Sequence, residues 1–584
     1  MVKGNTAPSN LIAASFNGKS ILTDSRSVTN TTEGHGKSRY DYGEVLGKSL
    51  LFYEAQRTGK LPSNNRVKWR GDSMMMDKGN NGEDLTGGYF DAGDHVKFGF
   101  PMAGFTTVLA WGAIDYEDAY IHSGQIEHIR QAIRWSTDYF IKAHTSQYEF
   151  YAQVGDGHDD HAIWSRPEDW TKPRPAWKLT PQQPGSEVLA ETAAALAAAS
   201  IVFRSVDPNY QSILLSHARQ LYDFANHFRG NYTHSIPHIT DFYNSWSGYG
   251  DELGWSAAWL LRATGDQRYQ ADVDQHYAEF GLTKLPLEFS WDNKIAGLQI
   301  LMAKITNNLS YRVQAENFCN YVVRQAPKTP KGLVFLQPWG SLRHASNVAF
   351  LCLQASEMNI NKQQYVDFAT QQINYILGDS GRSYVIGFGQ NYPQRPHHVS
   401  SSCPDRPAVC NWDAFSNPNP NPQLLIGALG PCNTETSLPI EFLNSISTDQ
   451  ASALINQRFD ECRYKKVINP HHVDDEITLE AIRSFTSVTS KNASHLCDTK
   501  GCLRDSHLLI ESNINNKNRR VCPDVILALK FTGPSTPQQI IQFKPCVLRI
   551  NHPEAQGDFL KFTCRKIQVL IQDEASTKYY RSLC

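Results

Sequence analysis

Apolar residues recur at three- and four-residue spacings along most of the chain after Tyr40, the pattern of helices packed through one face. This pattern predicts eleven helices before residue 430. They are Glu44–Leu61, Phe105–Ala119, Ile126–Ala143, Ser186–Val206, Gln211–Phe228, Asp251–Ala263, Asp272–Phe280, Lys294–Ile305, Tyr311–Ala326, His344–Met358 and Gln363–Leu377. Strand-like alternation is scarce in the same region. We therefore expect an all-α domain.

Several of these segments are apolar on more than one face, as in the stretch GWSAAWLL at Gly254–Leu261. A helix of this kind is buried on all sides. Two concentric rings of helices would provide that environment, because the inner ring is covered from both directions. An α-solenoid is the alternative, but we find no fixed repeat of roughly 30–50 residues.

The chain changes character near residue 430. Every Trp lies between Trp69 and Trp412, whereas eight of the twelve Cys follow residue 430. Residues 1–38 are polar and are expected to form a disordered leader. The expected organisation is this leader, a helical domain at 39–429, and an unassigned tail at 430–584. Strand-like segments such as RKIQVLIQ indicate that the tail is either a small β-containing domain or disordered.

Composition and charge exclude some classes of protein. Of the 584 residues 41% are hydrophobic and 20% charged, as in ordinary globular chains. The net charge of −2 lacks the basic footprint of a nucleic-acid-binding protein. No apolar run approaches the ~20 residues of a membrane span, and the early LIAASF run is shorter than a signal-peptide core of roughly 7–15 residues. We expect a monomer without nucleic-acid or membrane partners.

Candidate chemistry begins at the stretch GGYFDAGDHVKFGFP, which is too rich in glycine for a helix interior. It holds Asp91 and Asp94, three residues apart. Two close carboxylates raise one another's pKa or share a water molecule, as general base catalysis requires. On its own, such a pair also suits an Asx turn or a helix cap.

Four further loops combine Trp, Tyr, His, Asp and Arg. They read GDGHDDHAIWSRPEDW, DFYNSWSGYGDE, QPWGSLRHASN and RPHHVSSSCP. Together they favour a long open cleft for a polyhydroxylated polymer, with aromatic rings against sugar faces and a carboxylate pair that cuts. Cys403 and Cys410 flank a short Pro-containing loop and suit a local disulfide.

At these motifs the sequence resembles glycoside hydrolase family 9. The resemblance rests on YDYGEVLGKSLLFYEAQRTGKLP, WRGDS, GGYFDAGDHVKFGFPMA, QVGDGHDDHAIW, GYGDELGWSAAWL, FSWDNKIAG, WGSLRHASNVAFL and NYPQRPHH, and covers about residues 40–429. It implies an (α/α)6 barrel of twelve helices. It also implies a secreted endo-1,4-β-glucanase that cleaves cellulose and related β-glucans with inversion of configuration and requires no cofactor.

The resemblance also implies roles for individual residues. Asp94 corresponds to the general base and Asp91 to a second ligand of the attacking water, with His397 at the catalytic centre. The implied substrate-binding residues are His161, Tyr243, Trp246, Trp339 and Arg343. A structural calcium site of some members corresponds to Ser247, Gly250, Asp251, Glu252 and Asp292, a set of oxygen donors that suits a hard cation.

Two departures from the family pattern stand out. Val399 replaces an Arg that commonly follows the two His residues. After Leu429, the segment that carries the general acid Glu in the family is not recognisable. The nearest glutamates, Glu435, Glu441 and Glu461, lack its surroundings, and Ser447–Lys466 is the one candidate for a twelfth helix.

These departures leave two alternatives to an active enzyme of ordinary organisation. The chain could be a catalytically impaired β-glucan-binding relic. Its tail, which resembles no family known to us, could also result from a faulty gene model or aberrant splice.

Overall fold

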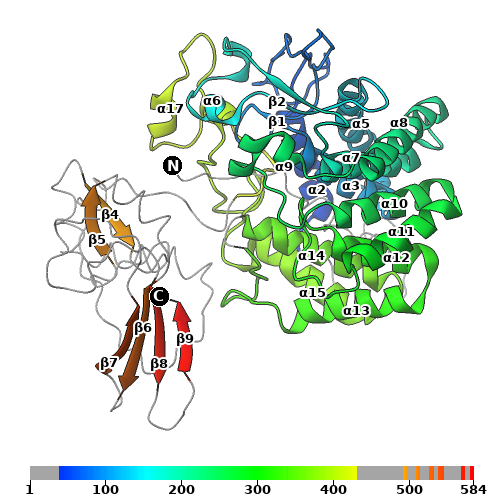
Figure 1. The fold of residues 1–584 in the computed structure, drawn as a ribbon. Helices are drawn as coiled ribbons and strands as arrows, with labels where there is room; N and C mark the ends of the chain where they lie inside the picture. The colour runs from blue at the N-terminus through cyan, green and yellow to red at the C-terminus, as the bar shows by residue number, and fades with distance from the viewer. Residues whose placement is uncertain are drawn as a thin grey trace, which may run out of the picture. The chain divides into compact units, whose positions relative to one another are not determined.

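A computed structural model describes residues 39–337 and 340–430 in full, together with the backbone of six strands between 491 and 583. The chain divides into two compact units near residue 435 (Figure 1). The expected leader, the candidate helix Ser447–Lys466 and the three candidate acid residues lie outside the described residues.

The first unit is helical, and all eleven predicted helices are present in its described part. They are α2 (Tyr42–Ala55), α3 (Gly99–Asp115), α5 (Ile126–Ala143), α7 (Ser186–Phe203), α8 (Pro208–His227), α10 (Gly250–Thr264), α11 (Gln267–Phe280), α12 (Ile295–Thr306), α13 (Leu309–Arg324), α14 (Ser341–Ser356) and α15 (Lys362–Asn374). Shorter helices are α4 (Glu117–His122), α6 (Gly157–His161), α9 (Tyr232–Ser235), α16 (Val399–Ser402) and α17 (Trp412–Ser416), with single turns η1 (Pro167–Asp169), η2 (Pro237–Asp241) and η3 (Tyr375–Asp379).

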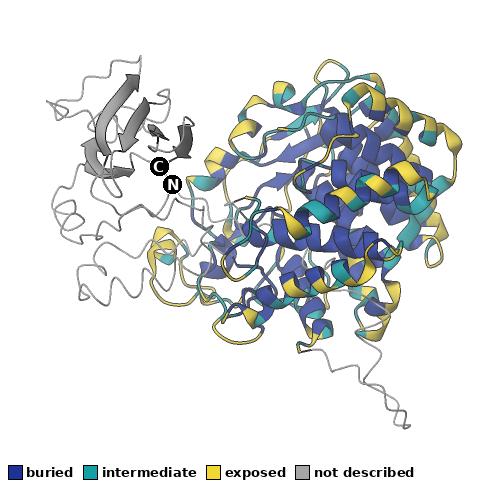
Figure 2. Ribbon diagram, turned by 90° about the horizontal axis from the view of Figure 1, so that it is seen from below, coloured by how far each residue is buried: buried dark blue, intermediate teal, exposed yellow. Residues whose placement is uncertain are grey.

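The long helices form two layers, as the sequence predicts for an (α/α)6 barrel. Helices α3, α7, α10, α12 and α14 are buried along nearly their whole length. Helices α5, α8, α11, α13 and α15 each bury one face against them and expose the other (Figure 2). Among the described helices only α7 is long and apolar enough to cross a membrane, and 89% of it is buried in this core.

Two of the helix boundaries that differ from the prediction have a clear local cause. Helix α3 begins at Gly99, six residues early, because Pro101 falls in its first turn, where no hydrogen bond from a backbone N–H is required. Helix α2 ends at Ala55 rather than Leu61, and Gly59 just beyond it adopts φ +89°. A residue with this positive φ cannot continue a right-handed helix.

A three-stranded antiparallel sheet in the first unit was not predicted. It consists of β1 (Lys97–Phe98), β2 (Phe150–Val154) and β3 (Ala176–Leu179), in the order β1-β2-β3. All five residues of β2 are buried, so the strand shows no polar alternation in the sequence. The sheet matters for function because β1 follows Asp94 by three residues.

The second unit contains β-strands, in line with the prediction of a small β-containing domain for the tail. Strands β4 (Lys491–His495) and β5 (Leu508–Ser512) pair antiparallel. A four-stranded sheet has the order β7-β6-β8-β9, from β6 (Val525–Phe531), β7 (Pro537–Lys544), β8 (Ile567–Gln572) and β9 (Tyr579–Leu583). Strand β8 lies within the predicted strand-like segment RKIQVLIQ.

Candidate active site

The two candidate catalytic carboxylates lie in one tight turn between α2 and β1. The backbone N–H of Asp94 donates to the Asp91 carbonyl at 3.0 Å, and that of Asp91 donates to Val96 at 2.9 Å. Ala92 within the turn adopts φ +40°, a left-handed conformation that is costly for a residue with a Cβ. Strain of this kind persists where the surroundings hold a functional loop in place.

The glycine at position 93 is required by a close contact between this turn and a distant segment of the chain. A Cβ on Gly93 would lie 2.4 Å from the His397 carbonyl oxygen, so only glycine allows the turn to approach the His397–His398 segment this closely. The N–H of Val399 donates to the Gly93 carbonyl at 2.9 Å and joins the two segments. Val399 itself is 5% exposed, so this position offers no polar group to a substrate.

Asp91 is buried and hydrogen-bonded. Its Oδ2 accepts a 2.5 Å hydrogen bond from the Tyr243 hydroxyl. This bond connects the turn between α2 and β1 to the loop before α10. Burial raises the pKa of Asp91 to about 6, although the Tyr243 hydrogen bond and the positive charge of Arg343 oppose the rise. The structure therefore brings Asp91, Tyr243 and Arg343 close together.

Asp94 is more exposed than Asp91, and its Oδ1 accepts the N–H of Val96 at 2.9 Å. Burial raises its pKa well above the usual value, and the negative charges of Asp91 and Asp160 raise it further. A carboxylate with a raised pKa is a stronger proton acceptor once ionised. This is the electrostatic setting that a general base requires.

Asp160 is a third buried carboxylate at this site, and the sequence analysis did not single it out. It lies in α6, and its Oδ1 accepts the N–H of His95 at 3.1 Å. Burial raises its pKa to about 7. Ligand atoms of Asp94, Asp160 and His161 all lie within 4.8 Å of one another. The only signal in the sequence was the density of Asp and His in GDGHDDHAIW.

His161 and His397 lie next to this carboxylate group. The Nδ1 of His161 donates to the Gly157 carbonyl at 2.6 Å, which holds the ring in one orientation. Burial, and then the nearby His161, lower the pKa of His397 to about 4. His397 is thus neutral near pH 7 and can act through hydrogen bonds rather than through charge.

Gln56, at the end of α2, connects the catalytic turn to the histidine segment. Its Nε2 donates to the Phe90 carbonyl at 3.4 Å and to the Ala92 carbonyl, while its Oε1 accepts from His398 Nε2 at 2.7 Å. His398 Nδ1 in turn accepts the N–H of Ser401 at 3.0 Å. His398 is therefore a fully bonded structural residue, and Gln56 is a second contributor that the sequence did not reveal.

Aromatic side chains surround the approach to the carboxylates. Trp291 packs against Tyr243 with ring centroids 4.9 Å apart, and both line a small cavity of about 30 Å³ with Arg343. Trp246 is 76% exposed, as expected for a ring that meets a substrate from solvent. Trp339, the remaining predicted substrate residue, lies outside the described residues.

The predicted calcium-binding residues come together at the start of α10. Ser247 Oγ lies 3.2 Å from Asp251 Oδ1 and donates to the Asp292 carbonyl at 2.6 Å, and Gly250 is the first residue of the helix. Both carboxylate oxygens of Glu252 are buried without a hydrogen-bond partner among the described residues. Buried, unpartnered carboxylate oxygens beside other oxygen donors fit a hard divalent cation.

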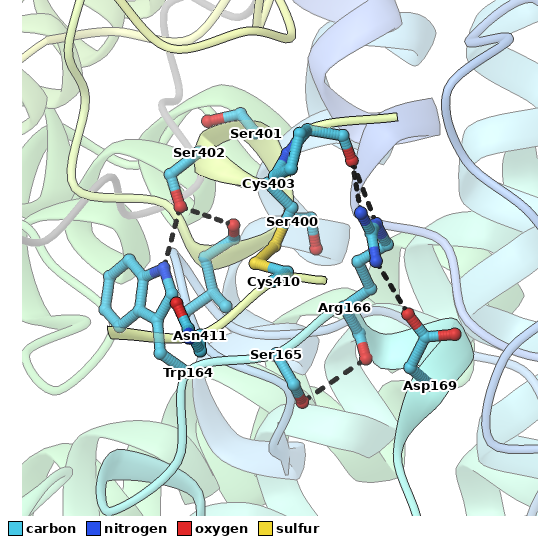
Figure 3. The surroundings of a disulfide bond; sticks show 12 residues. Trp164, Ser165, Arg166, Asp169, Ser400, Ser401, Ser402, Cys403, Cys410 and Asn411 are labelled. Carbon is cyan, nitrogen blue, oxygen red and sulfur yellow. Dashed lines mark hydrogen bonds and ion pairs between the residues drawn. A yellow bond between two sulfur atoms is a disulfide. The ribbon is translucent and has the colours of Figure 1, made fainter. Parts of the chain in front are cut away.

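The predicted disulfide between Cys403 and Cys410 is present (Figure 3). Trp164 and Arg166 flank it, with Trp164 Nε1 donating to Ser402 Oγ at 2.8 Å and Arg166 Nε donating to the Pro404 carbonyl at 3.0 Å. These contacts connect the loop after α16 to the segment that carries His161.

A helical double layer with paired carboxylates and aromatic side chains in its loops is the arrangement expected of a glycoside hydrolase. Comparison with known proteins agrees, because the model of glycosyl hydrolase family 9 matches residues 42–460. The chain belongs to this family and is a hydrolase of the endoglucanase type.

Relatives of known name support this assignment. Endoglucanase A of Bacillus pumilus is 42% identical over 77% of this chain and 72% of its own length, and endoglucanase 15 of Arabidopsis thaliana is 42% identical over 68% and 88%. The solved endoglucanase of the termite Nasutitermes takasagoensis is 55% identical, with a TM-score of 0.66 over 67% of this chain and 90% of that one. Cel9M of C. cellulolyticum, solved in complex with cellobiose, is 34% identical, with a TM-score of 0.62 over 67% and 90%.

The tail also has a match, which the sequence analysis did not find. The model of the zinc-binding loop region of homing endonuclease matches residues 454–555. The two matched ranges overlap at 454–460. The family 9 match ends at residue 460, about thirty residues beyond the predicted boundary at residue 429.

Proposed function

We propose that this chain is an endo-1,4-β-glucanase that hydrolyses internal bonds of cellulose and related β-glucans with inversion. The observation that carries the proposal is the Asp91–Asp94 turn, held by Tyr243 and Gly93 beside the neutral His397 and the exposed ring of Trp246. Cel9M of C. cellulolyticum was solved with cellobiose and the endoglucanase CelQ of Clostridium thermocellum with cellotetraose, and both complexes support the substrate class.

In this mechanism Asp94 removes a proton from a water molecule as the oxygen attacks the anomeric carbon. Asp91 accepts a second hydrogen bond from that water and is itself oriented by Tyr243. A general acid must protonate the leaving oxygen from the opposite side, ~6.5–9.5 Å from the base. Glu435 and Glu441 fall within the family 9 match and are the acids to test first, whereas Glu461 falls just beyond it.

The alternative of a binding relic gains no support from the comparisons, since the named relatives are endoglucanases. We also propose that the protein is secreted, because the Cys403–Cys410 disulfide is typical of oxidising compartments.

The test is to follow viscosity and reducing ends together during hydrolysis of carboxymethylcellulose, and to follow the anomeric proton signals of cellohexaose products by NMR. An endo-acting, inverting enzyme lowers viscosity before many reducing ends appear and releases the α-anomer first. Release of cellobiose with no early fall in viscosity, or the β-anomer as first product, would contradict the proposal.

We further propose that Ser247, Gly250, Asp251, Glu252 and Asp292 bind a structural calcium ion. Calcium should raise the melting temperature of the chelator-treated protein, because an ion that binds only the folded state stabilises it by mass action. Glu252→Gln should abolish this shift, whereas Glu127→Gln, at an exposed position in α5, should leave it intact. An equal calcium shift in all three proteins would refute the site.

For the tail, we propose that residues 454–555 bind zinc, on the similarity to the zinc-binding loop region alone. Cys497 and Cys502, which lack the spacing of a zinc ribbon, lie inside this match and are candidate ligands. Elemental analysis of the full chain should find about one zinc ion, lost in the double variant Cys497→Ser/Cys502→Ser. A metal-free protein after zinc loading would refute this proposal without affecting the hydrolase.

A further inference from the structure

Helix α17 presents two large aromatic rings to solvent beside the candidate active site. Trp412 is 42% exposed and Phe415 is 41% exposed, and no residue of this five-residue helix is buried. Single exposed apolar residues are common on protein surfaces. Two adjacent aromatic rings held edge to face, with centroids 5.5 Å apart and ring planes at 83°, instead indicate a binding surface, in which one ring offers its face to a ligand and the other its edge.

The loop that carries α17 is held in place by a disulfide and by hydrogen bonds from two arginines. The Cys403–Cys410 disulfide closes its first part (Figure 3). Arg166 donates to the carbonyls of Pro404 and Ala408. At the other end, Arg395 Nη2 donates to the Phe415 carbonyl at 2.9 Å. A surface that is already ordered costs little conformational entropy when it binds.

The two rings are continuous with the active site through aromatic contacts. The Phe415 centroid lies 5.7 Å from that of His397, and Trp164 lies behind both rings at 4.9 Å from Phe415 and 5.4 Å from Trp412. Figure 1 shows α17 next to α6, the helix of His161. His397 thus forms the link between the carboxylate group and α17.

The polar surroundings of the rings suit a neutral, hydroxyl-rich ligand. Asn411, Asn417 and Asn419 are exposed around α17, as is Asp413 within it, and amide and carboxylate groups both bind sugar hydroxyls. A protein partner usually binds a wider apolar patch. Near α17 in sequence, the exposed apolar side chain besides Trp412 and Phe415 is Val409, so the patch is narrow.

We propose that Trp412 and Phe415 form a glucan-binding platform, on which a β-1,4-glucan chain that passes His397 stacks its sugar rings outside the catalytic centre. This inference rests on the proposed endoglucanase function. It predicts that the platform serves long chains most, because a polymer extends past His397 on both sides of the bond that is cut, whereas a short oligosaccharide can fill the catalytic centre without reaching α17.

The test compares kcat/KM on barley β-glucan with kcat/KM on cellotetraose for the full chain and its variants. In Trp412→Ala/Phe415→Ala the ratio of the two values should fall about tenfold, mainly through a higher KM on the polymer. Trp412→Phe should keep most of the ratio that Trp412→Ala loses, because phenylalanine also has a flat ring. Trp412→Leu, which is apolar but has no flat ring, should lose as much as Trp412→Ala. Val409→Ala, in the same disulfide-closed loop, is the matched control and should leave the ratio unchanged.

Melting temperatures of all variants should match the wild type, which separates loss of binding from loss of folding. An unchanged ratio in the double variant, with the wild type active, would overturn the platform and leave the proposed function intact. If the wild type hydrolyses neither substrate, the proposed function fails, and calorimetric binding of cellohexaose then decides the platform by the same set of variants. A platform covered by the tail or by a second copy of the chain would show no variant effect on cellohexaose binding.

Discussion

The proposed catalytic site holds three carboxylates close together. Asp91, Asp94 and Asp160 all have raised pKa values, with burial as the largest cause in each case. Within the described part of the chain, only Asp91 among them accepts a hydrogen bond from a side-chain hydroxyl, that of Tyr243. Because their protonation is linked, changing one carboxylate should change the behaviour of the others.

Asp160→Asn should shift the acid limb of the pH profile of kcat/KM to lower pH. The substitution removes a negative charge that raises the pKa of Asp94, so Asp94 ionises and becomes an active base at lower pH. The measurement is kcat/KM on carboxymethylcellulose from pH 4 to 9. Asp159→Asn, at the exposed neighbouring position, is the control. A limb that stays in place or moves upward would exclude an electrostatic influence of Asp160 on the base.

The same carboxylates should affect stability. The folded-state pKa values of Asp91 and Asp160, about 6 and about 7, exceed the unfolded value near 4, so the folded protein binds more protons between about pH 4 and 7. Their contribution to stability is present below pH 4 and is lost as pH rises through this window. Melting temperatures of Asp160→Asn should therefore decline less steeply over pH 4–7 than those of the wild type, and an equal decline would contradict the assignment.

At the scale of elements, the inner helices meet through large aromatic side chains. Trp111 of α3 contacts Trp255 and Trp259 of α10 and Phe350 of α14, with centroids 5.2–5.7 Å apart. All three Trp are fully buried. These contacts join three inner helices at one point and should contribute strongly to the stability of the barrel.

Trp259→Ala should lower the free energy of unfolding by ~3–5 kcal/mol, because it leaves a large cavity among rigid helices. Trp246→Ala removes a ring that is 76% exposed and should change stability by less than about 1 kcal/mol. Urea denaturation followed by circular dichroism measures both. Similar losses in the two variants would contradict the assigned core.

The elements differ in how well the sequence predicts them. The helices were predictable because amphipathic periodicity in the outer layer and all-round apolarity in the inner layer are both local signals. Strand β2 was missed because it is buried on both faces. Gln56 and Asp160 were missed for another reason, since their roles depend on contacts with His398 and His95, 342 and 65 residues away in the chain.

At the scale of the whole molecule, the chain joins a family 9 domain to a segment similar to the zinc-binding loop region of homing endonuclease. The family motifs identified the domain and the residues around Asp94, because those motifs are long and appear in order. The general acid was not predictable, since the segment after Leu429 lacks the family's recognisable pattern. The central claim is therefore that this chain, tail included, still hydrolyses β-glucan with Asp94 as base.

The most direct test is the release of reducing sugar from carboxymethylcellulose by the purified 584-residue chain and by its Asp94→Asn variant. We predict release by the wild type and a rate lower by a factor of ~10²–10⁴ in the variant, as for loss of a general base. A wild-type chain that binds cellohexaose yet releases no sugar, or a variant that retains full activity, would contradict this account.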